Sequence, residues 1–161
     1  MNEKQTERVW SRVMCAQAGD APDVLPPQEP GSGGVLTEGR LLELVSAEHS
    51  SALTYRALAG MACGCARTQL LQLAEQERCH SRKLAALYFL RTGRKACPEP
   101  GRKPCVACLT EALRERWHAE QEDAKLYRTL SGGPDAELFR CLAEQEAQHA
   151  CRLLGVLECT L

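Results

Sequence analysis

The chain has 161 residues, enough for one domain with a substantial core but too few for two. Its 20 Lys and Arg residues are balanced by 21 Asp and Glu residues, so net charge provides no attraction to nucleic acid or to an anionic membrane. Only 4% of residues are aromatic, and Ala and Leu are abundant, which favours helices over sheets. We therefore expect an all-α protein with neither a nucleic-acid nor a membrane partner.

The start of the sequence has no apolar segment typical of a secretion signal. No apolar run approaches the roughly 18 residues that a membrane-spanning helix needs. We therefore expect a cytoplasmic protein. In that reducing compartment, clustered cysteines such as these 10 mark metal sites, redox sites or buried thiols more often than disulfides.

Residues 1–36 are expected to precede the folded domain. A short amphipathic helix is predicted at 2–17, where Val9, Trp10 and Val13 fall on one side. Residues 19–34 are crowded with Pro and Gly, which is typical of an extended linker. The domain itself is expected to cover 37–161.

Four long helical patterns follow, at about 37–59, 67–91, 108–130 and 135–157. Thr37 is the expected N-cap of the first helix, Gly60 and Gly64 bracket a short turn, and Thr92-Gly93 ends the second helix. The connector at 92–108 is rich in Pro, Gly and Cys and cannot form a continuous helix. Two helices, a long connector and two more helices predict a four-helix bundle with one crossover between the second and third helices.

The helical region contains an internal repeat. LAEQERCH at 73–80 returns as LAEQEAQH at 142–149, and AEHSSALTYRAL at 47–58 matches AEQEDAKLYRTL at 119–130. Both pairs occur in the same order and at nearly the same separation. The sequence therefore predicts a duplicated helical hairpin, covering 37–91 and 108–158.

Each repeated octad ends in Glu-x-x-His, and residues three apart share one face of a helix. That face also carries leucines, so the Glu-His pairs are expected to point inward. One Glu on each of the other two helices lies on a similar apolar stripe. The six side chains predicted to meet in the core are Glu48, Glu77, His80, Glu120, Glu146 and His149.

Burying four carboxylates without compensation would be costly. A pair of divalent metals explains four Glu and two His around one core, because di-iron and di-manganese bundles combine one Glu from each of two helices with Glu-x-x-His from each of the others. A single Glu-x-x-His would more often lie on a solvated face, but two in matching contexts favour a dinuclear site. The His-Glu-x-x-His motif of zinc proteases is absent.

On these residues, the segment 37–158 resembles the rubrerythrin branch of the ferritin-like superfamily. The resemblance implies a ferritin-like bundle whose six inward Glu and His residues bind two Fe, with Mn or Zn as alternatives. Asp123, on the face of Glu120, resembles a further carboxylate ligand of the family, whereas Ser51 occupies the matching place in the first helix. Tyr55 and Tyr127 resemble tyrosines beside the family's metal site, and core packing explains them equally well.

The resemblance also implies an activity: reduction of hydrogen peroxide or O₂, or oxidation of Fe(II), by a homodimer supplied by an unknown electron donor. Because the chain ends soon after Glu158, no rubredoxin module is expected after the bundle. Two alternatives remain open at this point. One is an iron-binding or storage protein, and the other is a helical module whose cysteines carry the redox or metal chemistry.

A second, thiolate site is a further candidate. Cys63 and Cys65 are expected in the turn between the first and second helices, and the connector carries Cys105 and Cys108. About 15 extended residues span roughly 50 Å, more than a helix of two dozen residues requires. The connector could therefore bring all four cysteines to one end of the bundle as a Zn or Fe site, or they could be unrelated thiols.

Overall fold

A computed structural model describes residues 36–98 and 106–161. Within these residues the chain forms four helices and no strand, which confirms the all-α prediction for this part of the molecule. The helices are α2 (Glu38–Met61), α3 (Gly64–Thr92), α4 (Leu109–Leu130) and α5 (Ala136–Glu158). The predicted helix at 2–17 and linker at 19–34 lie outside the described residues.

The ends of the first two helices follow from local capping chemistry. The Thr37 hydroxyl accepts a hydrogen bond from the Arg40 backbone N–H at 3.1 Å and so caps α2, as predicted. Gly93 ends α3 in the left-handed conformation with φ of 68°, which glycine adopts without steric cost. The prediction that Gly60 lies in the turn is wrong, because α2 continues to Met61 and the turn shrinks to two residues.

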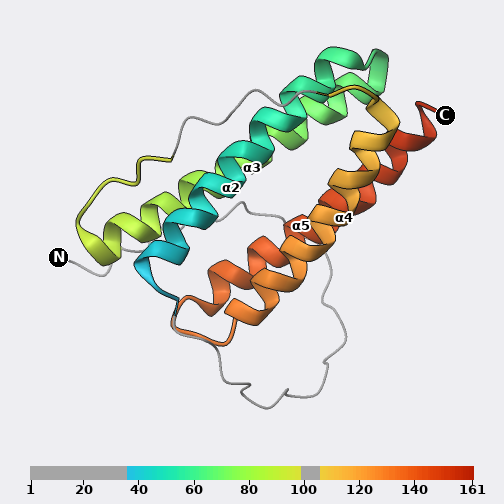
Figure 1. The fold of residues 1–161 in the computed structure, drawn as a ribbon. Helices are drawn as coiled ribbons and strands as arrows, with labels where there is room; N and C mark the ends of the chain where they lie inside the picture. Colours follow the sequence, from blue (N-terminus) through green and yellow to red (C-terminus); the bar gives the residue numbers. More distant parts are fainter. Residues whose placement is uncertain (1–35, 99–105) are drawn as a thin grey trace, which may run out of the picture.

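The helices pair as two antiparallel hairpins, α2 with α3 and α4 with α5, that lie beside one another (Figure 1). The hairpins contact each other through α3 with α5 and through α2 with α4. In the part of the chain that the structure describes, no helix combines the length and apolar character required to cross a membrane.

Two apolar clusters hold the hairpins together, one at each end of the molecule. The first joins the end of α2 and the start of α3 to the start of α4 and the end of α5, and includes Leu58, Leu73 and Leu113. The second joins the opposite helix ends and includes Leu41 and Leu142. Helix α3 thus ends in the second cluster, and α4 begins in the first. Between the two clusters, all four helices place polar, ionisable side chains in the interior.

We predict that Leu73→Ala and Leu142→Ala destabilise the protein to a similar extent. The two leucines occupy matching positions of the octads, one in each cluster, and both are 0% exposed. Each truncation should lower the free energy of unfolding, measured by urea denaturation, by about 2–5 kcal/mol. Leu90→Ala, at an exposed position of α3, is the control and should leave stability nearly unchanged. A negligible loss at either octad leucine would contradict this packing.

Candidate metal centre

The interior between the two apolar clusters is ionic. All six residues predicted to meet in the core are buried there, none more than 5% exposed: Glu48, Glu77, His80, Glu120, Glu146 and His149. Each helix contributes at least one of them, so the inward orientation predicted from the octads is confirmed. Their role as metal ligands stays a prediction.

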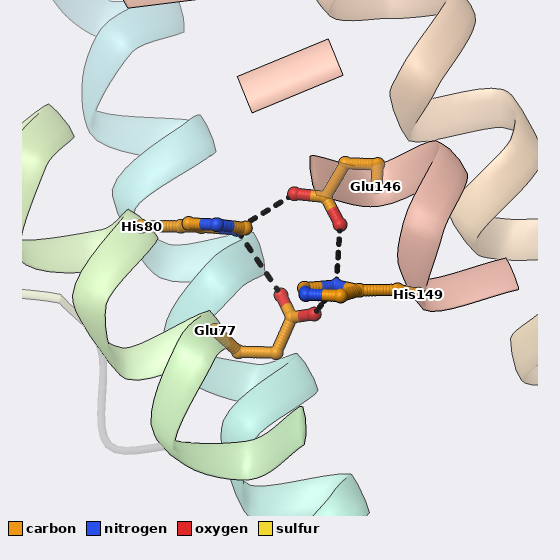
Figure 2. Close-up of side chains that lie close together, drawn as sticks. All are labelled: Glu77, His80, Glu146 and His149. Carbon is orange, nitrogen blue, oxygen red and sulfur yellow. Dashed lines mark ion pairs between the residues drawn. The ribbon is translucent and has the colours of Figure 1, made fainter. Parts of the chain in front are cut away.

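Four of these residues, two from each hairpin, converge on one point. One potential ligand atom from each of Glu77, His80, Glu146 and His149 lies within 4.8 Å of all the others. His80 Nδ1 is 2.7 Å from Glu146 Oε1, and His149 Nδ1 is 2.7 Å from Glu77 Oε1, so each imidazole faces a carboxylate of the opposite hairpin. The two rings stack with centroids 5.3 Å apart (Figure 2). This group could hold a metal ion.

The remaining two glutamates flank the group symmetrically. Glu48 Oε2 lies 3.6 Å from His80 Nδ1, and Glu120 Oε2 lies 3.3 Å from His149 Nδ1. Each glutamate also accepts a hydrogen bond from a buried tyrosine of the other hairpin. Tyr55 donates to Glu120 at 2.5 Å, and Tyr127 donates to Glu48. The two copies of the sequence repeat therefore make matching contacts across the centre.

The carboxylate oxygens and imidazole nitrogens of this group are placed better for metal coordination than for hydrogen bonds with one another. Although the nitrogen–oxygen distances in the group are short, the atoms are not aligned as hydrogen bonds. Among the described residues, four atoms of this group consequently have no hydrogen-bond partner: Glu77 Oε1, His80 Nδ1 and both carboxylate oxygens of Glu146. Buried polar atoms are normally satisfied, and carboxylate and imidazole donors facing a shared centre are a typical ligand set for Fe, Mn or Zn.

Without metal, the carboxylates determine the charge of the imidazoles. Burial alone would lower their pKa, but the adjoining carboxylates outweigh it and raise the pKa of His80 to about 10 and that of His149 to about 12. Burial would raise the pKa of Glu120, yet His149 and Arg116 hold it at about 2. The pKa of Glu77 is raised, first by burial and then by the charge of Glu146.

Arg116, a residue that the sequence analysis did not single out, makes the centre asymmetric. Its guanidinium forms an ion pair with Glu120 and lies over the Tyr55 ring, 5.0 Å from the centroid. In the alignment of the repeats its position is that of Leu44, so the departure from the repeat was the available signal. Arg116 occupies one side of the centre with a fixed positive charge.

A cavity of about 230 Å³ lies on the other side of the centre, against Glu48. The residues that line it are Arg40, Glu43, Leu44, Ala47, Glu48, Ser51, Asp123, Leu126 and Tyr127. Asp123, predicted as a further ligand, is thus placed with Glu48 and Ser51 rather than in the converging group of four. Partial burial, followed by the charge of Glu48, raises the pKa of Asp123 to about 7.

Polar side chains also support the centre from outside. His80 Nε2 lies 2.9 Å from Gln145 Oε1, which also accepts a hydrogen bond from Lys83 at 3.3 Å. At the matching place in the other hairpin, Arg152 donates to Gln76 at 2.6 Å. The Gln145 contact is of the kind that fixes the orientation of a metal-binding imidazole through its second ring nitrogen, whereas Gln76 makes no such contact with His149, whose Nε2 has no partner among the described residues.

The predicted thiolate site is only partly covered by the structure. Cys105 lies outside the described residues, while Cys63, Cys65 and Cys108 flank the starts of α3 and α4. Cys65 Sγ lies 3.4 Å from the Sγ of Cys159, a residue to which the sequence analysis gave no role. Among the described residues, no cluster of three or more cysteines with metal-ligand spacing occurs.

Comparison of the chain with protein-family models, with curated proteins and with solved structures finds no match. The resemblance to rubrerythrins therefore depends on the repeated motifs and on the site described above.

We predict that the chelator-treated protein loses stability as the pH rises from 7 to 10. The folded-state pKa values of His80 and His149, about 10 and about 12, exceed the ordinary value of about 6.5. The contribution of the two charged imidazoles to the free energy of unfolding is therefore fully present below about pH 6.5. It is lost as the pH rises through the folded-state pKa of each residue. Urea denaturation at each pH measures the loss. The His80→Gln/His149→Gln variant is the control and should show a shallower decline. Equal declines in the two proteins would contradict the assigned charges.

Proposed function

We propose that this protein is a ferritin-like, rubrerythrin-type diiron-carboxylate oxidoreductase that reduces hydrogen peroxide or O₂, or oxidises Fe(II). The observation that carries the proposal is the convergence of Glu77, His80, Glu146 and His149 from two hairpins. The flanking Glu48 and Glu120 complete the set of four carboxylates and two imidazoles that a dinuclear bundle site uses.

The arrangement of the helix ends supports the ferritin-like part of the proposal. Helix α3 ends in one apolar cluster and α4 begins in the other. A connector that joins opposite ends of a four-helix body is the feature that separates this superfamily from simple up-and-down bundles. Residues 99–105 of that connector lie outside the described part of the chain.

The side chains around the centre have distinct tasks in this proposal. Two bound iron ions would supply the electrons that reduce peroxide to water. Tyr127 holds Glu48 in place and Tyr55 holds Glu120, each with a proton kept at the hydroxyl. Burial and the neighbouring carboxylate raise the pKa of each tyrosine. Arg116 offsets part of the negative charge beside Glu120.

The decisive test is metal loading of the full chain under anaerobic conditions. We expect two Fe(II) per chain by elemental analysis and rapid oxidation, followed in the visible spectrum, when peroxide is added. Glu146→Gln should reduce metal content and oxidation strongly because it removes a carboxylate shared by both imidazoles. Glu144→Gln, at an exposed position of the same helix, is the matched control and should behave as the unmodified protein.

Other outcomes of this experiment separate the alternatives. A single Zn per chain with no oxidation would contradict the proposal. A large assembly by size-exclusion chromatography that continues to accumulate iron would favour storage. Circular dichroism of Glu146→Gln distinguishes loss of metal from loss of the fold.

The cavity against Glu48 is the route that we propose for peroxide, because Arg116 occupies the opposite side. Ala47→Phe should fill the cavity and slow peroxide-driven oxidation several-fold while leaving the metal content unchanged. Ala119→Phe is the matched control, since Ala119 occupies the corresponding place in the repeat and does not line the cavity. Equal rates for the two variants would rule out this route.

A further inference from the structure

Two cysteines far apart in the sequence meet at one end of the molecule. Cys65 lies in the first turn of α3, and Cys159 follows α5 directly. Their sulfur atoms are 3.4 Å apart, and both residues are exposed. Figure 1 shows the C-terminus at the same end of the molecule as the turn between α2 and α3.

Among the described residues, the other cysteines make no such sulfur–sulfur contact. Cys63, Cys79, Cys97, Cys141 and Cys151 have no sulfur partner, and Cys108 contacts the Thr110 hydroxyl. Disulfide sulfurs lie about 2.05 Å apart, so bonding Cys65 to Cys159 requires an approach of little more than an ångström. Side-chain rotation beside a helix end can provide that movement, and exposure admits a small oxidant.

We propose that Cys65 and Cys159 form a redox-active dithiol that peroxide converts to a disulfide. The thiolate of one cysteine attacks a peroxide oxygen, the O–O bond breaks, and one water leaves as a sulfenic acid forms. The second thiol attacks that sulfur, the S–O bond breaks, and a second water leaves with the S–S bond formed. Two thiols and one peroxide thus yield one disulfide and two waters.

The bond would close a loop that runs from the start of α3 to the end of α5. That loop contains every residue of the candidate metal centre except Glu48. A crosslink that closes so long a loop restricts the unfolded chain, so the oxidised protein should unfold at a higher urea concentration than the reduced protein. Peroxide would then stabilise the scaffold of the centre through a site outside it.

The test uses the full chain, reduced, freed of metal with a chelator and treated with hydrogen peroxide. Non-reducing peptide mapping should recover a tryptic peptide that contains Cys65 joined to the one that contains Cys159. Because Cys63 lies in the same peptide as Cys65, two matched variants identify the partner. Cys65→Ser should abolish the link and the gain in urea midpoint, and Cys63→Ser should retain both.

Three results would overturn the proposal. One is the absence of a link after peroxide has consumed thiols, and another is a link that survives in Cys65→Ser. The third is a stoichiometric Zn, measured in the protein before chelation, that Cys65→Ser loses and Cys63→Ser retains, which would make the pair part of a metal site. None of these results bears on the proposed diiron centre, because the first two are obtained without metal and the third concerns residues outside the Glu and His group.

Discussion

The burial of six ionisable side chains between two apolar clusters is the constraint on which the rest of this structure depends. Charged groups in a helical interior destabilise a fold unless other charges, hydrogen bonds or metal ions compensate them. Here His80 and His149 each face a carboxylate of the opposite hairpin, and Tyr55 and Tyr127 cross between hairpins to the two remaining glutamates. The polar centre therefore joins the same two hairpins that the leucine clusters join.

The duplicated hairpin makes the centre approximately symmetrical, and the positions at which the two copies differ make its two sides unequal. Arg116 stands where the other hairpin has Leu44, so one side of the centre has a partly buried guanidinium and the other has a cavity. Ser51 and Asp123, which match each other in the repeat, both line that cavity. The cavity gives the proposed route for a small molecule, next to Glu48.

Much of the centre could be predicted from sequence because helical periodicity places residues three apart on one face. Glu77 with His80 and Glu146 with His149 followed directly from the octads. Arg116 was missed because a charged residue four positions from a glutamate usually forms a solvated pair. The Cys65–Cys159 contact could not be predicted, since it depends on how the ends of two distant helices meet. Nor does the sequence identify the metal, because Fe, Mn and Zn accept the same ligands.

The central claim is that the converging carboxylates and imidazoles bind two iron ions. Anomalous X-ray diffraction at the iron edge, from crystals of the full chain loaded with Fe(II) under anaerobic conditions, tests it most directly. We expect two anomalous peaks per chain near Glu77, His80, Glu146 and His149, separated by about 3.5–4 Å as is typical of two-metal sites. An absence of iron among these residues, or a single peak at full occupancy, would contradict it.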